Sequence, residues 1–207
     1  MRGRLTRRRA AAAGLAALAC AGFALLARAS SYGPQPALTG VPGTGDLLGE
    51  MTCLSCHATS PLNPDGIGRI RLEGLPPLRE PGRRYPLVLR VEHPAEGRQR
   101  WGFQLTAVDA RTLIGAGRLV VVDPETTQVI EGGLAERQYV EHTETGTGIG
   151  RQGGMKWSFD WIAPASGHGD VAFFAAVNVA NGDGAKEGDW IFAPAPSPLV
   201  TLRGPAP

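Results

Sequence analysis

Apolar and polar residues alternate in short runs over most of the chain after Gly66. Between Tyr85 and Glu92 every second residue is apolar, and the same period recurs over residues 102–107 and 157–162. A period of two is the signature of half-buried β-strands. The longest apolar run covers residues 171–179. Shorter strand candidates cover residues 70–72, 119–122, 139–142 and 190–192.

Turn-forming residues separate these runs. The 207 residues include 29 Gly and 17 Pro, which is typical of many short strands joined by turns and unusual for a helical protein. Hydrophobic residues make up 43% of the chain, enough for a packed core. We therefore expect a mainly β fold, an antiparallel β-sandwich, over residues 67–193, followed by a Pro-rich tail at 194–207.

The first 29 residues have a different character. Residues 1–9 are strongly basic, residues 10–27 are small and apolar, and Ala27-Arg28-Ala29 provides the small-x-small pattern that precedes signal-peptide cleavage. A retained membrane anchor is the less favoured alternative, because the apolar run is rich in Ala and Gly rather than Leu and Ile. We expect an exported protein, in the periplasm or at the cell surface, that contacts a membrane only through this leader if the leader is retained.

The charge of the chain changes once the leader is set aside. The leader holds six of the 21 basic residues and none of the 19 acidic ones, which leaves 15 basic against 19 acidic groups. A net-negative body without a basic stripe argues against nucleic-acid binding.

Two cysteines remain after the leader, and they belong to the run Cys53-Leu54-Ser55-Cys56-His57. This is the attachment pattern of c-type haem. Two thiols about one helical turn apart reach the two vinyl groups of a porphyrin, and the adjacent imidazole becomes an axial ligand of the iron. We predict that Cys53 and Cys56 bind haem c and that His57 ligates its iron. Residues 30–66 form a linker and this haem segment, with a short helix from Asp46 through Met51 leading into it.

Other uses of the two thiols are less favoured. A Cys-x-x-Cys disulfide would be tight and redox-active, but the Gly- and Pro-rich flanks do not fit the strand and long helix of a thioredoxin-like site. A zinc site would want four ligands, and the sequence offers no second Cys/His pair.

Three stretches resemble the reeler domain, the module named for reelin. They are Trp101–Ala107, Trp157–Pro164 and Gly169–Asn178. Together with the Cys-x-x-Cys-His segment ahead of them, they resemble the bacterial proteins called choice-of-anchor V, over about residues 39–192. The resemblance implies an immunoglobulin-like sandwich in an extracytoplasmic setting, and it implies no particular activity. Such proteins often end in an anchoring tail, whereas this chain has a short Pro-rich end.

A haem iron has a second axial position. Our first choice for it is His142, because residues 138–143 lie in a stretch that resembles the family pattern. An open position remains an alternative. The other candidates are His93, His168, Met155 and Met51.

The remaining candidate chemistry has simpler interpretations. A Gly-rich loop gathers oxygen ligands of the kind calcium prefers, but hairpin-turn chemistry is the favoured explanation. These residues are Asn178, Asn181, Asp183, Glu187 and Asp189. The four tryptophans are expected in the core. No Gly-x-Ser-x-Gly elbow and no phosphate loop appear, and we expect the protein not to be an enzyme.

The sequence therefore leads to one predicted function and one alternative. The first is an exported single-haem protein that transfers one electron to a redox partner, which the sequence does not name. The alternative is an adhesion or matrix-binding module in which haem is structural or absent.

Overall fold

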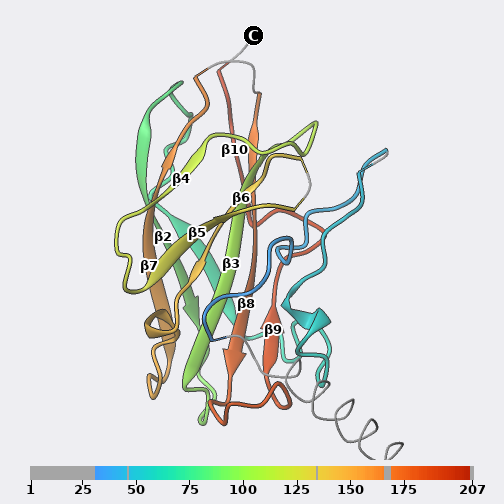
Figure 1. Cartoon of the computed structure of the whole chain (residues 1–207), viewed down its shortest axis with the longest axis vertical. Coiled ribbons are helices and arrows are strands. Elements are labelled where there is room, and N and C mark those ends of the chain that lie inside the picture. The colour runs from blue at the N-terminus through green and yellow to red at the C-terminus, as the bar shows by residue number, and fades with distance from the viewer. Residues whose placement is uncertain (1–30, 46, 134, 166–168, 206–207) are drawn as a thin grey trace, which may run out of the picture.

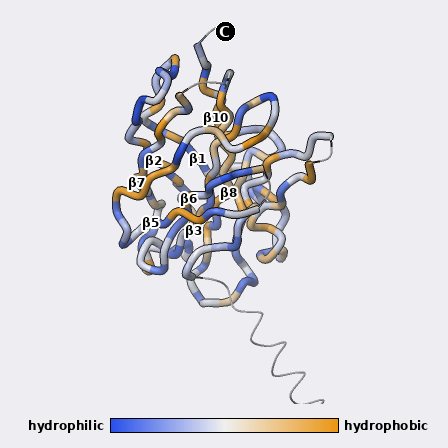
Figure 2. Tube along the Cα trace, turned by 45° about the horizontal axis from the view of Figure 1, so that its top comes forward, coloured by the Kyte–Doolittle hydropathy of each residue, from blue (hydrophilic) through white to orange (hydrophobic). Residues whose placement is uncertain are grey.

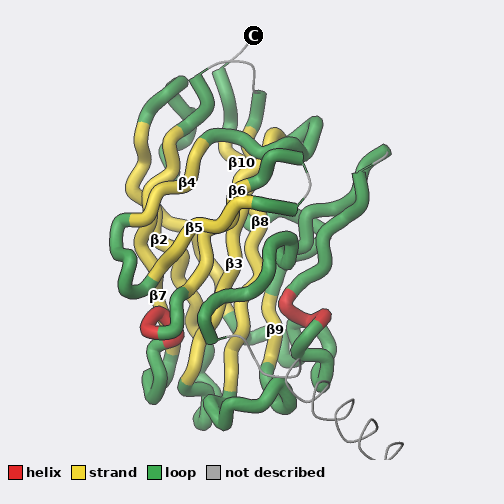
Figure 3. The backbone as a smooth tube through the Cα atoms, in the orientation of Figure 1, coloured by secondary structure: helices red, strands yellow, loops and turns green. Residues whose placement is uncertain are grey.

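Two antiparallel β-sheets make up most of the described chain (Figures 1 and 3). The structure, a computed structural model, describes residues 31–45, 47–133, 135–165 and 169–205. The first sheet has the strand order β1 (Arg69–Glu73), β2 (Arg84–Glu92), β7 (Gly154–Ile162), β4 (Arg118–Val121). The second has the order β10 (Val200–Leu202), β8 (Val171–Ala180), β3 (Arg100–Asp109), β6 (Gln138–His142), β5 (Thr127–Glu131), with β9 (Trp190–Phe192) also paired to β8. The predicted mainly β sandwich is confirmed.

The core lies between the two sheets and consists of the buried residues that alternate along the strands. Figure 2 shows the hydropathy of the residues along the trace. Trp157, Phe159 and Trp161 of β7 are at most 1% exposed. The rings of Phe103 and Trp157 lie 4.4 Å apart across the sandwich. Each buried indole N–H donates to a backbone carbonyl, so these large side chains are buried without an unsatisfied donor. Trp101 is buried in the same way, whereas Trp190 is half-buried under the guanidinium of Arg98.

Strand β8 is buried on both faces, and its outer face positions the segment that precedes the sandwich. Successive outward residues of β8 are Ala172, Phe174, Ala176 and Asn178. Ala172 and Phe174 pack against Val41, and Ala176 belongs to the same apolar cluster as Cys53. The segment 31–66 therefore lies along the outside of the second sheet, beside β8 and β9 (blue to cyan in Figure 1).

A buried ion pair ties this segment to β6. Nη1 of Arg137 lies 2.5 Å from Oε1 of Glu50, and both side chains are fully buried. The hydroxyl of Tyr139 donates to the same carboxylate at 2.7 Å, and the hydroxyl of Thr39 donates to its other oxygen at 2.5 Å. The carboxylate of Glu50 is therefore paired with the guanidinium of Arg137 and accepts two hydroxyl hydrogen bonds. We call this buried polar group, which joins the segment 31–66 to the second sheet, the polar clamp.

Three local predictions differ from the structure. The helix expected to lead into Cys53 is wrong over the described residues, because Gly40 and Glu50 instead exchange backbone hydrogen bonds with Met51 and Val41. The helices among the described residues are two short 3-10 turns, η1 (Cys53–Ser55) and η2 (Thr145–Thr147), and neither is long and apolar enough to cross a membrane. Strand β5 was not among the predicted strands, and β10 lies within the Pro-rich tail predicted for residues 194–207.

Candidate functional site

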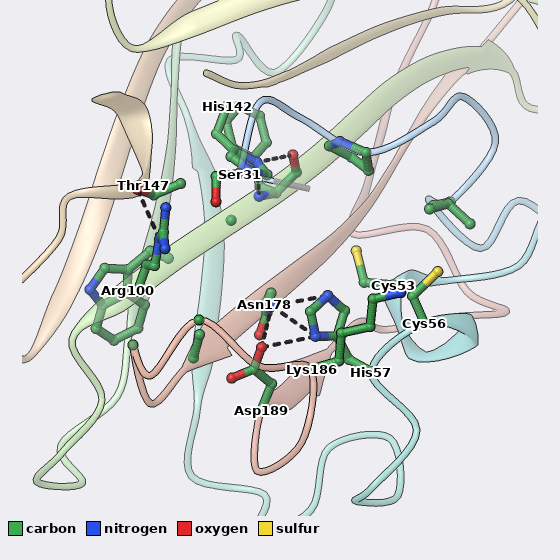
Figure 4. Close-up of a pocket in the computed structure, with 18 of the residues that line it drawn as sticks. Ser31, Cys53, Cys56, His57, Arg100, His142, Thr147, Asn178, Lys186 and Asp189 are labelled. Atoms are coloured by element: carbon green, nitrogen blue, oxygen red, sulfur yellow. Dashed lines mark hydrogen bonds and ion pairs between the residues drawn. The ribbon is translucent and has the colours of Figure 1, made fainter. Parts of the chain in front are cut away.

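A partly open pocket of about 350 Å³ lies between the Cys-x-x-Cys-His segment and the outer face of the second sheet. Cys53, Cys56 and His57 line it from one side, and His142 lines it from β6 (Figure 4). The remaining walls come from residues 31–38, β3 and the loop before β9. The structure thus brings all four predicted site residues to one pocket.

The turn η1 sets the directions of the first three side chains. The hydroxyl of Thr52 accepts a hydrogen bond from the N–H of Leu54, and this caps the turn. The N–H groups of Cys56 and His57 both donate to the carbonyl of Cys53, at 3.2 and 3.1 Å. One tight turn therefore projects two thiols and an imidazole into the same region.

The two thiols differ in environment. Cys56 is exposed, whereas Cys53 is 7% exposed and packs near Ala176 and Ile191. Burial raises the pKa of the Cys53 thiol from 9.0 to about 12. The two residues are not joined by a disulfide.

His57 lies in contact with acidic and amide groups of the sheet. Its Nδ1 atom is 2.8 Å from Oδ2 of Asp189, just before β9. The amide nitrogen of Asn178 is 3.4 Å from Nδ1 and 3.5 Å from Nε2. In Figure 4 the imidazole points toward these two residues.

His142 lies against the backbone of β3. Its Nδ1 atom is 3.0 Å from the amide nitrogen and 3.2 Å from the carbonyl oxygen of Phe103. A Cβ atom on Gly102 would come within 2.9 Å of Cε1 of this ring. Gly102 is therefore the position on β3 where the absence of a side chain lets the imidazole lie on the sheet.

The two imidazoles occupy neighbouring places on one sheet face. Gly102, beneath His142, and Asn178, beside His57, are direct cross-strand partners of β3 and β8. Cross-strand partners have their Cα atoms about 5 Å apart and project from the same face. The sheet register therefore brings together two histidines that are far apart in the sequence.

The other ligand candidates lie elsewhere or outside the description. His93 is fully buried between Trp190 and Phe192, and its two nitrogens are engaged by Asp65 and by the N–H of Ala95. Met51 is 58% exposed and Met155 packs against the core, and neither lines the pocket. His168 and the predicted signal peptide, residues 1–29, lie outside the described residues.

The loop before β9 uses its oxygen atoms for turn contacts. Asp183 accepts hydrogen bonds from the side chain of Asn181 and the N–H of Ala185, and Glu187 accepts one from the N–H of Lys186. These contacts fit the turn explanation. The described residues contain no cluster of three His, Cys, Asp or Glu side chains that could hold a metal ion by themselves.

The residues of the pocket fit a covalently bound haem. The donor set consists of two thiols and an adjacent imidazole, and a second imidazole, that of His142, lines the same pocket. The carboxylate on Nδ1 of His57 is the kind of partner that metal-ligating histidines usually have. The Oδ1 atom of Asn178 is buried and has no hydrogen-bond partner among the described residues, so it is an acceptor that a donor such as water would satisfy.

Comparisons with known proteins find similarity in fold. No family model matches the chain, and no curated protein matches it. The human F-spondin reeler domain is similar with a TM-score of 0.47 and 22% identity over 67% of this chain and 89% of that one. A second structure of that domain shows 23% identity over 67% and 92% of the two chains, with a TM-score of 0.47.

A cohesin is similar at a lower level. The sixth cohesin of scaffoldin B from Acetivibrio cellulolyticus has a TM-score of 0.37 and 8% identity, and the match covers 60% of this chain and 96% of the cohesin. These similarities concern the fold, and they transfer no ligand or activity to this chain.

Two parts of the site are not evident from the sequence as contacts of the histidines: the pair Asp189 and Asn178, and Gly102. Asp189 and Asn178 were weighed as calcium ligands, and no spacing in the sequence connects them to His57. Gly102 did carry a signal, because a glycine inside an alternating strand often marks a close approach.

Proposed function

We propose that this chain is an exported haem c protein that transfers single electrons. Cys53 and Cys56 would hold the porphyrin through thioether bonds, and His57 and His142 would be the imidazoles that bind its iron. One observation supports this proposal most strongly. The Cys-x-x-Cys-His turn and His142 line the same pocket, beside Asn178 and Gly102, which are cross-strand partners. The bound group would supply a one-electron couple whose potential depends on its axial ligands, hydrogen bonding and burial.

The protein's own residues define the chemistry of the pocket. Nδ1 of His142 lies within hydrogen-bond distance of the carbonyl of Phe103. The N–H of Phe103 donates to the same Nδ1 atom at 3.0 Å, and in that tautomer the proton of the ring is on Nε2. Nε2 would have a lone pair for a metal only after the proton has moved to Nδ1, which would then donate to the carbonyl of Phe103. Lys186 and Arg100 add positive charge to the pocket wall. Neither cation has a carboxylate partner among the described ion pairs, which suits a ligand that carries carboxylates.

Coexpression of the full chain with a haem c maturation system tests the attachment. We expect a haem-stained band on a denaturing gel and an intact mass higher by one haem. Replacing both thiols, as Cys53→Ala with Cys56→Ala, should abolish the band. A chain that folds but stays colourless under these conditions overturns the proposal.

The second ligand is tested by the optical spectrum of the loaded protein. His142→Ala should replace low-spin bands by high-spin ones, because one axial position loses its ligand. Met155→Leu is the matched control, since Met155 was a rival candidate and lies outside the pocket. A low-spin spectrum that is unchanged in His142→Ala removes His142 from the site.

A reeler-type binding module is the second candidate. The named structural neighbours are reeler and cohesin modules, which fits this function better than it fits an electron carrier. In this case the sandwich presents its loops to a protein or a sugar, and the pocket has no redox role. Electron exchange with a soluble c-type protein separates the two, because an electron carrier must be reduced and reoxidised by a protein partner, whereas any bound haem has a one-electron couple.

A further inference from the structure

Asp189 is the acidic residue that contacts His57. It is 2% exposed, and its Oδ2 atom lies 2.8 Å from Nδ1 of the imidazole. His57 belongs to the segment before the sandwich, and Asp189 belongs to the loop that leads into β9. The contact therefore connects the predicted iron ligand to the sheet.

The carboxylate is held in place independently of His57. Oδ2 also accepts a hydrogen bond from the side-chain amide of Asn178 at 3.0 Å. Oδ1 accepts one from the backbone N–H of Asn181 at 3.2 Å. Donors from β8 and from the loop after it thus fix the plane of the carboxylate before the imidazole contacts it.

This arrangement selects one protonation pattern of the imidazole. An ionised carboxylate only accepts hydrogen bonds, so Nδ1 of His57 carries the proton and Nε2 keeps its lone pair. A carboxylate on the outer nitrogen fixes the tautomer and the direction of a metal-ligating histidine and makes the ring a stronger donor. Asn178 supports this pattern because its amide holds Oδ2 in position.

We infer that Asp189 is the positioning residue that keeps Nδ1 of His57 protonated and presents Nε2 to the pocket. The inference rests on the proposed function for its redox consequence. A stronger imidazole donor stabilises the oxidised iron more than the reduced iron, so Asp189 lowers the reduction potential of the loaded protein. Asp189, which the sequence places in a turn with oxygen ligands of the kind calcium prefers, contacts the histidine.

The first test uses the haem-free full chain. The ¹⁵N NMR shifts of the His57 ring report which nitrogen carries the proton. We expect the Nδ1–H tautomer in the natural chain and its loss in Asp189→Asn, whose amide can donate to Nδ1. Asp183→Asn is the matched control, because it removes a carboxylate from the same loop without touching His57.

The second test uses the haem-loaded chain. Asp189→Asn should still attach haem, since both thiols remain, and its reduction potential should rise above that of the natural chain. Asp183→Asn should leave the potential unchanged. Potentials that are equal in the natural chain and Asp189→Asn overturn the inference, as does an unchanged His57 tautomer.

The two readouts separate this inference from the proposed function. If the natural chain takes up no haem, the proposed function and the redox role of Asp189 are both wrong. The NMR measurement on the haem-free chain still tests whether Asp189 accepts a hydrogen bond from Nδ1 of His57. If Asp189→Asn does not fold, Asn178→Ala replaces it, because this change leaves the carboxylate and removes one of its holders. A smaller rise in potential then supports the inference, and no rise overturns it.

Discussion

Glycine 102 shows how a single missing side chain shapes the pocket. We expect Gly102→Ala to displace the ring of His142, because the new Cβ would lie 2.9 Å from Cε1. The overpacking should cost about 1–3 kcal/mol of unfolding free energy. Urea denaturation measures this, with Gly169→Ala as the control, since a Cβ there meets nothing within 4 Å. Equal losses in both variants would contradict the close approach.

The two thiols should react at very different rates in the folded, haem-free chain. Cys56 is exposed, whereas Cys53 is buried with the pKa of its thiol raised to about 12. At pH 8 iodoacetamide should modify Cys56 and leave Cys53 intact, because the thiolate is the reactive form. Peptide mass mapping measures the labelling, and denatured protein should be labelled at both sites. Equal labelling of the folded chain would show that Cys53 is accessible.

Asp109 should make the stability depend on pH in the acidic range. Burial opposes ionisation of its carboxyl, but hydrogen bonds from Thr112 and Arg111 outweigh it, and the pKa lies below the usual 3.8. A carboxyl whose pKa is lower in the folded chain contributes stability above pH 3.8, and this contribution is lost as the pH falls through the folded pKa.

The corresponding variant is Asp109→Asn. Its unfolding free energy should fall less than that of the natural chain when the pH drops from 5 to 2. Urea denaturation at several pH values gives both curves. Glu96→Gln, which changes an exposed carboxylate, should follow the natural chain. Parallel curves for Asp109→Asn and the natural chain would contradict the shift.

Among the elements, the link between the segment 31–66 and β6 depends on the pair Glu50–Arg137. Glu50→Gln leaves a fully buried guanidinium without its counter-charge. We expect a loss of about 3–5 kcal/mol in the free energy of unfolding, measured by urea denaturation. Glu80→Gln removes the partner of an exposed arginine and should leave the stability close to that of the natural chain. A small effect of Glu50→Gln would show that the clamp contributes little.

The sequence predicted those elements whose pattern is set by burial. Alternation identified β2, β3 and β7, and a long apolar run identified β8, because each has a face that must be covered. Strand β5 was missed because Thr127-Gln128-Val129-Ile130-Glu131 does not alternate. Strand β10 is three residues long and lies in a Pro-rich end, where composition suggests a loop.

The candidate site was predictable only where its residues are neighbours in the chain. The spacing of Cys53, Cys56 and His57 is itself the motif. Asp189 reaches His57 through the pairing of β9 with β8, and such long-range pairing leaves no local pattern in a single sequence. The expected helix before Cys53 failed because paired backbone segments satisfied the same N–H and carbonyl groups.

At the scale of the molecule, the segment 31–66 covers the outer face of the second sheet, where β8 has apolar side chains that would otherwise be exposed to water. A chain restricted to residues 67–207 would expose Phe174 and Ala176 and would leave Arg137 without Glu50. We expect this fragment to lack a cooperative unfolding transition, whereas residues 31–207 should show one. Circular dichroism during thermal unfolding distinguishes them. A cooperative transition in the shorter fragment would show that the sandwich is an independent domain.

If haem is attached as proposed, the burial of Cys53 against β8 would impose an order on maturation. Once the segment has closed on the sheet, the sulfur is out of reach of an enzyme that handles extended polypeptide. Whatever is joined to this cysteine must be joined while the chain is still open, so the last folding step ends the time available for modification. A chain that folds early would then persist as a stable but unmodified product.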